Sequence, residues 1–377
     1  MQTYCIILAA GNSKRYDKNS DKLFSRIYGS PLISYTLMNI LKVFSKDKIF
    51  IVINKNLSSP KRLYLKTFTN NELVLGGSTR FKSLKNAIKK FKTDVNILIH
   101  DAARPNIEKS LLSKLKSEIE KKNNKLVVPY TSIKNSLKLK RKAKYISVNR
   151  SDYISSQTPQ AFTLNDVTRK IINNTHDNVA DELEIFEKSN FNIKYIEGSD
   201  SNIKITNKSD LKLIKKLIGN SIKIGNAFDI HKIKKGNYLS LGGLKFESNY
   251  SLIGHSDGDV VIHSIIDVIL GALSKKDIGY YFPSSNDKLK NVNSVILLQN
   301  IYKRFNLQNI LILNLDITII SEIIRLEKYK LKIRNNISKL LRCPKSKINI
   351  KAKSSDKIGI IGKSKGIACM ASILIYE

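Results

Sequence analysis

A carboxylate and two imidazoles in the second half of the chain have the residue types of a metal site. Asp229 and His231 lie two residues apart on a segment expected to be extended, so both side chains would point to one face. His263 follows within a predicted helix. One carboxylate and two imidazoles can bind Zn²⁺ tetrahedrally and leave the fourth position open, as phosphate chemistry requires. Alternatively, Asp229 caps a turn and His263 fills the core, and spacing alone does not separate the two interpretations.

A glycine turn followed by two cations indicates an anion site in the first half. The first apolar run ends in the small-residue turn 9–11, and Arg15 and Lys22 follow it. Small residues at the carboxyl end of a strand let the backbone approach phosphate oxygens, and the cations can neutralise the phosphate charge. A lone glycine turn usually only joins a strand to a helix, so the two cations strengthen the prediction.

Two further polar clusters are expected at the same edge of a sheet. One is the segment 76–83, Gly-Gly-Ser-Thr-Arg-Phe-Lys-Ser, and the other is the segment 100–105, His-Asp-Ala-Ala-Arg-Pro, at the end of an apolar run. The carboxyl ends of parallel strands meet at one edge, where ligands of open α/β sheets bind. Asp101 could hold Mg²⁺ against phosphates there, or it could cap the next helix.

The elements that must position the first-half residues follow an alternating pattern. Short apolar runs are separated by amphipathic, helix-like stretches, which is typical of an α/β fold with a mostly parallel, Rossmann-like sheet. The predicted strands are Tyr4–Ala9, Ile49–Ile53, Val95–Ile99 and Leu126–Val128.

The pattern changes near Asn207, where a second domain is expected to begin. Ser209 can cap a helix over Asp210–Ile218, and Gly219 can end it. We therefore expect two domains, residues 1–219 and 222–377. The second is predicted to be an α+β layer with helices on one side of a sheet. Its expected elements are a strand at Ile222–Ile224, a strand and loop through His231, a helix from near Gly258 to about Leu273, and strands at Leu311–Ile320, Ile348–Lys353 and Ile367–Ile375.

The formal net charge of +35 is large enough to suggest a nucleic-acid partner. However, the lysines are spread along the whole chain, without a basic tail or an arginine-rich block with interleaved aromatics. We interpret the charge as a lysine bias on solvated faces, which also suits anionic substrates. No nucleic-acid partner is expected.

The cysteines and the apolar runs indicate where the protein works. Cys5, Cys343 and Cys369 form neither a disulfide framework nor a metal-binding pair, which fits a reducing cytosol. No run approaches the roughly 18 apolar residues that span a bilayer. The apolar N-terminus lacks a basic leader and runs directly into a glycine turn, so we expect neither secretion nor a membrane partner.

Residues 1–218 resemble the 2-C-methyl-D-erythritol 4-phosphate cytidylyltransferase family. The resemblance rests on the Leu-Ala-Ala-Gly loop, the cations after it, the Gly-Gly segment, Asp-Ala-Ala-Arg-Pro and Thr158-Pro159-Gln160, all in family order. It implies attack of methylerythritol phosphate on the α-phosphorus of CTP, with pyrophosphate leaving and Mg²⁺ or Mn²⁺ assisting. No general base is required, because a phosphate monoester is already ionised near neutral pH.

The resemblance also assigns roles to residues of the first half. Arg15 and Lys22 would stabilise the pentacoordinate phosphorus, next to the triphosphate on the Gly11–Arg15 loop. Arg80 is also placed on the substrate. Cytosine would contact Ala9, Ala10, Gly77 and Ser83, and the acceptor or its metal would contact Asp101, Arg104, Arg150, Thr158 and Lys204. The family's Asp-Thr element is replaced here by Asn135-Ser136.

Residues 222–377 resemble the 2-C-methyl-D-erythritol 2,4-cyclodiphosphate synthase family. The shared segments are Gly254–Asp259, Asp277-Ile278-Gly279, Asp316-Ile317-Thr318 and Gly366–Cys369, together with the Asp and His residues already described. The resemblance implies that the 2-phosphate of CDP-methylerythritol phosphate attacks the β-phosphorus and that CMP leaves. It further implies Zn²⁺ on Asp229, His231 and His263, a second divalent ion on the diphosphate, and a homotrimer with active sites between subunits.

Further residues of the second half receive roles from this resemblance. His255 and Ser256 would hold the attacking end, Asp356 would bind the second ion, and the helix N-terminus near Gly258 would attract phosphate. The other positions assigned to substrate are Asp277, Gly279, Ser354, Ser355, Ile360 and Lys363. Three family segments differ in this chain: the Thr-Thr-Thr-Glu run is Lys353–Asp356, the Ala-Pro-Lys turn is Ile323–Arg325, and Asn286 replaces an acidic residue.

Two other functions remain open at this level. The first half could transfer a nucleotide to another sugar phosphate while the second half serves only oligomerisation. Alternatively, the chain could be a basic nucleic-acid-binding protein on a degenerate enzyme fold. Neither alternative explains two ordered sets of motifs.

Overall fold

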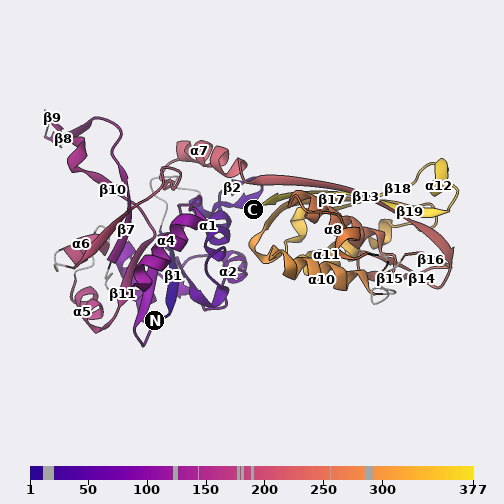
Figure 1. Ribbon diagram of the computed structural model, residues 1–377, viewed down its shortest axis with the longest axis horizontal. Helices are drawn as coiled ribbons and strands as arrows, with labels where there is room; N and C mark the ends of the chain where they lie inside the picture. The colour runs from indigo at the N-terminus through magenta and orange to yellow at the C-terminus, as the bar shows by residue number, and fades with distance from the viewer. Residues whose placement is uncertain are drawn as a thin grey trace. The chain divides into compact units, whose positions relative to one another are not determined.

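Two separate hydrophobic cores divide the chain into an N-terminal unit, Met1–Ile218, and a C-terminal unit, Gly219–Glu377. The computed structural model, shown in Figure 1, describes residues 1–11, 21–121, 126–142, 144–175, 179, 182–187, 191–254, 256–283, 285 and 292–377. Within these ranges, no helix combines the length and the apolar character that crossing a bilayer would demand.

A mixed β-sheet forms the centre of the N-terminal unit. Its strand order is β10-β7-β11-β6-β1-β4-β5, with β12 beside β7. Strand β1 pairs in parallel with β4 and β6, whereas β11 runs antiparallel between β6 and β7. The strands are β1 (Thr3–Ala9), β4 (Ile49–Ile53), β5 (Val74–Leu75), β6 (Val95–Asp101), β7 (Leu126–Ser132), β10 (Ile154–Ser156), β11 (Gln160–Leu164) and β12 (Ile193–Glu197). The α/β architecture predicted from the apolar runs is confirmed.

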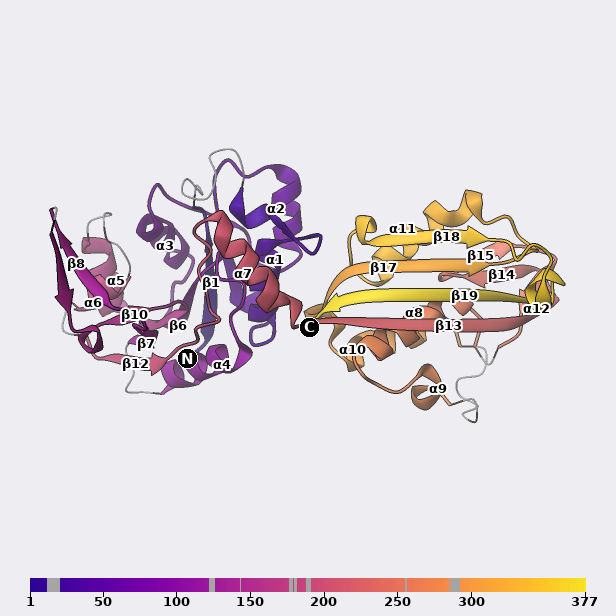
Figure 2. The same cartoon turned by 90° about the horizontal axis from the view of Figure 1, so that it is seen from above.

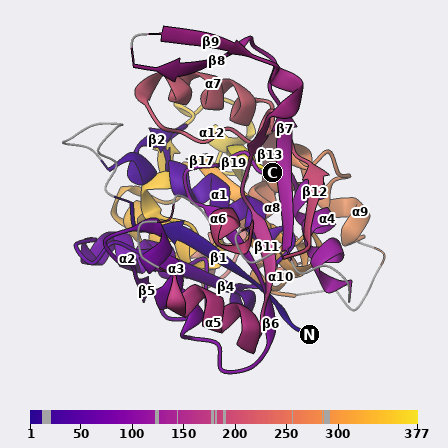
Figure 3. The ribbon, with the colours of Figure 1, turned by 90° about the vertical axis from the view of Figure 1, so that its left-hand side faces the viewer.

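Helices cover this sheet, and a hairpin leaves it. The helices are α1 (Leu32–Leu41), α2 (Ser59–Lys66), α3 (Arg80–Ile88), α4 (Lys109–Glu120), α5 (Asp166–Asn174), α6 (Glu182–Glu187) and α7 (Lys208–Gly219). A short two-stranded piece is formed by β2 (Arg26–Ile27) and β3 (Ser30–Pro31). The hairpin of β8 (Leu137–Arg141) and β9 (Lys144–Val148) pairs only with itself and stands apart from the main sheet (Figure 3).

The start of α7 differs from the prediction. The helix begins at Lys208, so Ser209 lies inside it and does not cap it. The cap is instead Asn207, whose Oδ1 accepts the backbone N–H of Asp210 at 3.1 Å. Asn and Ser are comparable caps, and here the Asn two residues earlier caps the helix. Gly219 ends the helix, as expected.

A five-stranded sheet with helices on one face forms the C-terminal unit (Figure 2). Its order is β16-β13-β19-β17-β18, and only β17 and β18 pair in parallel. The strands are β13 (Ile222–Lys235), β16 (Tyr250–Leu252), β17 (Leu311–Ile320), β18 (Ile348–Lys353) and β19 (Gly366–Tyr376), with a separate hairpin of β14 (Tyr238–Leu241) and β15 (Leu244–Glu247). The helices are α8 (Val260–Ala272), α9 (Ile278–Tyr281), α10 (Ser294–Arg304), α11 (Lys330–Leu340) and α12 (Gly359–Gly362). The predicted α+β layer is confirmed.

Helix α8 lies directly on the backbone of β13 because of one glycine. A Cβ atom at Gly225 would stand 1.9 Å from the carbonyl oxygen of Val268, so no larger residue fits without moving the helix. The burial of β13 alternates from this point, and Asp229 and His231 lie on the side that faces α8. This close approach brings the first turn of α8 within side-chain reach of the strand.

A buried carboxylate fixes the beginning of α8. Asp259 is fully buried, and its Oδ1 accepts the backbone N–H groups of Val261 and Ile262, both at 3.0 Å. The turn between β14 and β15 donates two more, from Gly242 to Oδ1 at 2.9 Å and from Gly243 to Oδ2 at 2.6 Å. Both glycines have positive φ, which other residues rarely adopt. Asp259 therefore joins the hairpin to the helix.

Replacing this carboxylate by an amide should destabilise the C-terminal unit. In Asp259→Asn, an NH₂ group would face N–H donors, and we expect a loss of about 2–3 kcal/mol of unfolding free energy. Urea unfolding with pulse proteolysis, read through fragments of this unit, measures the change. Asn293→Ala, which removes the exposed cap of α10, is the control and should cost about 1 kcal/mol. An Asp259→Asn effect no larger than the control would contradict this account.

Candidate functional site

A carboxylate surrounded by cations lies at the end of β6 in the N-terminal unit. Asp101 accepts hydrogen bonds from Arg80 Nε at 3.1 Å and Lys204 Nζ at 2.7 Å, and Arg104 Nε lies 3.8 Å away. Burial opposes ionisation of Asp101, but the charges of Arg80 and Lys204 outweigh it and hold its pKa well below the ordinary value. Three cations around one carboxylate leave an excess of positive charge, which suits an anionic ligand better than a metal ion.

A buried histidine, His100, is hydrogen-bonded to residues of this cluster and next to it. The Arg104 carbonyl can only accept, so His100 Nε2 carries the ring proton and donates to it at 3.1 Å. In the neutral ring Nδ1 is then bare and accepts the Thr158 hydroxyl at 3.2 Å, while Thr158 Oγ1 accepts the Asp101 N–H at 3.1 Å. Burial lowers the pKa of His100 to about 4, so the imidazole is neutral near pH 7 and can make both bonds. Asn202 adds a bond from Nδ2 to the Thr158 carbonyl at 2.8 Å.

The predicted nucleotide residues converge beside this cluster. Strands β1 and β6 pair so that Leu8 faces Asp101, which places the turn after β1 at the same sheet edge. A Cβ atom at Gly76 would lie 2.3 Å from Ala10 Cβ, so the two segments are in close contact. The Gly77 N–H donates to Ser83 Oγ at 3.0 Å, which ties the glycine loop to α3. The structure thus brings together Ala10, Gly77 and Ser83.

The cationic side chains that are predicted to bind phosphate do not all lie at the Asp101 cluster. Lys22 Nζ donates to the Ile205 carbonyl at 2.8 Å, next to Lys204 of the Asp101 cluster. The Arg150 guanidinium instead donates to the Lys134 carbonyl at 2.6 Å, near the β8–β9 hairpin, and makes no hydrogen bond to the cluster among the described residues. Arg15 lies outside the described residues.

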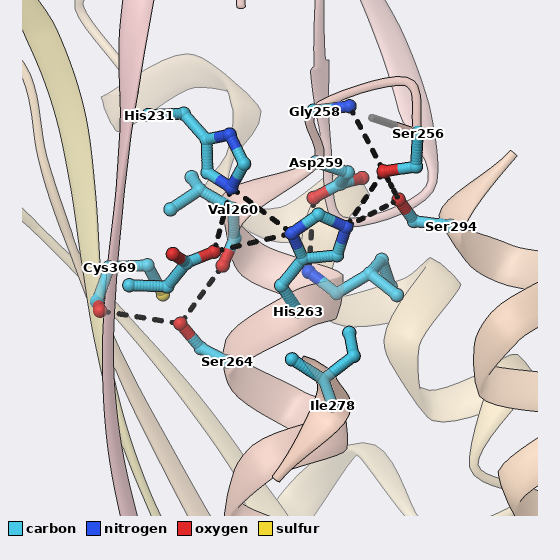
Figure 4. A network of polar contacts seen from close by, with 12 residues as sticks. His231, Ser256, Gly258, Asp259, Val260, His263, Ser264, Ile278, Ser294 and Cys369 are labelled. Carbon is cyan, nitrogen blue, oxygen red and sulfur yellow. Dashed lines mark hydrogen bonds and ion pairs between the residues drawn. The ribbon is translucent and has the colours of Figure 1, made fainter. Parts of the chain in front are cut away.

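Three electron-pair donors converge in the C-terminal unit. His231 Nε2 lies 3.0 Å from Asp229 Oδ2 and 3.1 Å from His263 Nδ1, and His263 Nδ1 lies 3.3 Å from Asp229 Oδ2 (Figure 4). All three ligand atoms fit within 4.8 Å of one another. Burial opposes ionisation of Asp229, but its bonds to the two histidines hold its pKa well below the ordinary value. We call these three residues the metal triad.

The hydrogen bond made by the second ring nitrogen of His231 shows that the triad suits a cation. His231 Nδ1 lies 2.8 Å from the Ile253 carbonyl oxygen, which can only accept, so Nδ1 carries the proton. Its Nε2 then presents a lone pair to the carboxylate of Asp229. Facing lone pairs repel unless a proton or a cation lies between them, and the pKa of His231 is raised, against the effect of burial, chiefly by its bond to Asp229. An aspartate and two imidazoles are a Zn²⁺ donor set, so the residues fit the ion.

One expectation about this site is wrong. The N-terminus of α8 does not offer free N–H groups to phosphate, because the Asp259 carboxylate already accepts those of Val261 and Ile262. Ser256 Oγ lies 2.9 Å from His263 Nε2, so its hydroxyl contacts a triad residue. His255, Asn286 and Asp287 lie outside the described residues.

Other predicted residues lie at the same end of the sheet but on different strands. His231 pairs with Ile367 on β19, Ala368 pairs with Ile320 on β17, and Ile320 pairs with Lys353 at the end of β18. The segment 354–363 therefore begins three strand spacings, roughly 14 Å, from β13. Ile360 and Lys363 follow in and after α12. Asp277 and Gly279 lie nearer, since the Ile278 N–H donates to Asp267 on α8 at 2.7 Å.

Glu322 holds one of the predicted site segments in place, a contact that the sequence did not reveal. Its Oε1 accepts the N–H of Ser355 at 2.7 Å and the hydroxyl of Ser355 at 3.0 Å. It thereby holds a turn in which Asp356 and Lys357 both have positive φ, +50° and +62°. Asp356 Oδ1 accepts the Ser354 hydroxyl at 3.1 Å. The bonding partners are 33 residues apart along the chain, and no local pattern connects them.

Family models match both units. The model described as 2-C-methyl-D-erythritol 4-phosphate cytidylyltransferase matches residues 3–220, and the YgbB family model matches residues 222–376.

Curated relatives match along the whole length. A Bifunctional enzyme IspD/IspF from Pelagibacter ubique is 40% identical over 99% of this chain and 99% of its own. One of the same name from Campylobacter hominis is 34% identical over 97% of this chain and 95% of its own. A crystal structure of 2C-methyl-D-erythritol 2,4-cyclodiphosphate synthase from Plasmodium vivax is 29% identical, covers 41% of this chain and 98% of that chain, and has a TM-score of 0.35.

The buried His100 should make the N-terminal unit sensitive to acid. Its pKa is about 4 in the folded protein and 6.5 when unperturbed, so the unfolded state binds the proton first as the pH falls between these values. As the pH falls through this window, the free energy of unfolding should therefore decrease. His100 contributes at most about 1.4 kcal/mol per pH unit to the decrease. His100→Asn keeps an acceptor for Thr158 and does not titrate, so its pH dependence should be shallower.

Pulse proteolysis in urea across this pH range, read through fragments of the N-terminal unit, measures the difference. Fragments of the C-terminal unit provide the internal control, because their pH dependence should not change. Equal slopes for the wild type and His100→Asn would show that His100 is not the titrating group.

Proposed function

The chain belongs to the 2-C-methyl-D-erythritol 4-phosphate cytidylyltransferase family, and a YgbB-family domain follows in the same polypeptide; from this membership we propose a residue-level mechanism for two reactions. The protein is a bifunctional enzyme of the non-mevalonate isoprenoid pathway. The N-terminal domain, residues 1–219, transfers CMP from CTP to methylerythritol phosphate and releases pyrophosphate. The C-terminal domain, residues 222–377, cyclises the 2-phosphorylated CDP-methylerythritol and releases CMP.

The excess positive charge around Asp101 supports the first reaction. In this mechanism, Arg80, Arg104 and Lys204 attract the acceptor phosphate, while Asp101 orients their side chains and binds the acceptor with Thr158. The acceptor phosphate oxygen then attacks the α-phosphorus of CTP in line, and pyrophosphate leaves. Such phosphoryl chemistry depends mainly on positioning and charge stabilisation, which fixed cations provide.

The small-residue loop provides the nucleotide site. Ala9, Ala10 and Gly77 allow the cytosine to approach the backbone, and Ser83 holds the glycine loop in place. Lys22 and Arg15 stabilise the charge that develops on the phosphorus. A divalent ion, Mg²⁺ or Mn²⁺, accompanies the triphosphate and neutralises part of its charge.

The convergence of the metal triad is the observation that best supports the second reaction. Asp229, His231 and His263 are proposed to hold Zn²⁺, which orients and polarises the β-phosphate as a Lewis acid when it is bound. His255 and Ser256 hold the attacking 2-phosphate, and Asp277 and Gly279 contact the sugar portion. The 2-phosphate oxygen forms the new bond to the β-phosphorus, and the bond to the CMP oxygen breaks.

The separation between β13 and β18 supports an active site shared between subunits. Ser354, Ser355 and Asp356 are proposed to bind the diphosphate and its second ion, with Ile360 and Lys363 near the nucleotide. Within one chain this segment starts roughly 14 Å from the strand that carries the triad, so one diphosphate cannot contact both directly. A neighbouring subunit can supply the second group.

The outer face of the C-terminal sheet is the proposed assembly surface for a trimer. Phe228 and Met370 pair in register across β13 and β19 and are 56% and 51% exposed. Ile230 beside them is exposed as well, at 42%. An exposed cluster of large apolar side chains on a sheet is typical of a protein–protein interface. The three cysteines are unpaired, which favours the reducing cytoplasm as the location.

Two substitutions should separate the two reactions. Lys22→Ala should lower CTP-dependent pyrophosphate release by roughly two to three orders of magnitude, as expected for losing one preorganised transition-state donor. His263→Ala should abolish zinc binding and CMP release. Each variant should leave the other reaction within about twofold of the wild type, because the residues lie in different units. Purified enzyme is assayed with CTP, methylerythritol phosphate and Mg²⁺, and separately with phosphorylated CDP-methylerythritol.

Lys116→Ala, which removes a half-buried lysine on α4 that pairs with Glu120, is the matched control and should retain both activities. Undiminished pyrophosphate release in Lys22→Ala would refute the proposed role of Lys22. Purified wild-type protein that is folded but binds no zinc would refute the metal assignment.

A charge on the outer sheet face should dissociate the assembly. Phe228→Lys places an ammonium group at the centre of the apolar cluster, so trimers should become monomers and CMP release should fall with them. Light scattering coupled to size exclusion measures the mass. Leu331→Lys, at a 58% exposed position on α11, is the control and should remain trimeric. Unchanged mass for Phe228→Lys would place the interface elsewhere.

A further inference from the structure

The ring nitrogen of His263 that points away from the triad is held by two serine hydroxyls. Nε2 lies 3.0 Å from Ser294 Oγ and 2.9 Å from Ser256 Oγ (Figure 4). The two hydroxyl oxygens are 3.1 Å apart, and all three residues are buried. A hydroxyl can either donate or accept, so these contacts alone do not fix which ring nitrogen carries the proton.

A carboxylate next to the serines decides the direction of the bonds. Asp257 Oδ1 accepts the Ser294 hydroxyl at 2.5 Å and also the Ser294 backbone N–H at 3.2 Å. An ionised carboxylate cannot donate, so the Ser294 proton must point toward Asp257. Ser294 Oγ therefore turns a lone pair to the imidazole at 3.0 Å. A proton on His263 Nε2 satisfies this contact, whereas a bare Nε2 would place two lone pairs face to face.

We infer that Asp257 and Ser294 are positioning residues that keep the proton of His263 on Nε2, so that Nδ1 presents its lone pair to the metal triad. The inference rests on the proposed zinc function of that triad. His231 is fixed in the opposite sense by the Ile253 carbonyl, which keeps the proton on Nδ1. Each imidazole thus offers the unprotonated nitrogen that a metal requires, because a different hydrogen-bond partner holds the proton on its other nitrogen.

The two positioning residues are themselves anchored by the backbone. The Asp257 N–H donates to the Val292 carbonyl at 3.1 Å, and Ser294 is the first residue of α10, which Asn293 caps. The loop before α8 and the start of α10 are therefore joined at this point. Because both ends are fixed, the orientation of the Ser294 hydroxyl does not depend on a mobile side chain.

Two substitutions test the inference. Asp257→Ala removes the acceptor of the Ser294 hydroxyl, which is then free to donate to His263 Nε2 and so to move the ring proton to Nδ1. Ser294→Ala removes the acceptor altogether. We expect zinc affinity to fall roughly 10–100-fold in each variant, as is usual when a partner of a ligating histidine is lost. Competition with a chromophoric chelator measures the affinity in the full-length protein.

The metal-free protein gives an independent measurement. Nitrogen chemical shifts of ¹⁵N-labelled histidines, read above neutral pH, distinguish a protonated ring nitrogen from a bare one. The wild type should show His263 protonated on Nε2, and Asp257→Ala should show a shift toward Nδ1. A wild-type ring protonated on Nδ1 would overturn the inference even if zinc binds well.

Matched controls separate positioning from folding. Ser264→Ala removes another buried serine of α8, whose hydroxyl bonds to the Val260 and Cys369 carbonyls and not to the imidazole, and it should keep wild-type zinc affinity. Ser294→Thr keeps a hydroxyl and should recover most of the affinity lost in Ser294→Ala. Unchanged affinity in both Asp257→Ala and Ser294→Ala would overturn the inference. If the wild type binds no zinc, the metal assignment fails, and the nitrogen shifts still decide the position of the proton.

Discussion

The backbone contact between α8 and β13 determines what the C-terminal unit can do. Because Gly225 has no side chain, α8 packs directly against β13, and His263 on the helix contacts Asp229 and His231 on the strand. The Asp259 carboxylate then fixes where the helix begins. A side chain at position 225 would push α8 away from β13 and separate triad atoms that now lie about 3 Å apart. The chemistry therefore depends on the contact between α8 and Gly225.

Both units concentrate charged groups at one place. In the N-terminal unit, three cations surround a single carboxylate, which leaves an excess of positive charge. In the C-terminal unit, the Asp229 carboxylate lies beside two imidazole nitrogens, a set of donors that could hold a metal ion. Preorganised charge of this kind is formed during folding, so no reorganisation is needed when the substrate arrives. It also explains why partner residues such as His100 are buried and neutral.

Sequence reasoning succeeded where the signal is local and failed where it depends on distant partners. The apolar pattern predicted β17 and β18 to the residue, and the spacing of Asp229 and His231 correctly placed both on one face of a strand. It could not show that Asp259 uses up the helix N–H groups, since two of its donors are 16 and 17 residues away. Ser294 and Glu322 were missed for the same reason, because their bonding partners are contributed by other loops.

The pairing of β13 with β19 determines where the two ends of the C-terminal unit lie. Ile222, at the start of the C-terminal unit, faces Tyr376, near its end, so the segments that enter and leave this unit lie together at one edge of the sheet. Asp229 is seven residues further along the same strand, roughly 23 Å from that edge. A sequence joined to the chain at this end of β13 is therefore far from the metal triad along the strand.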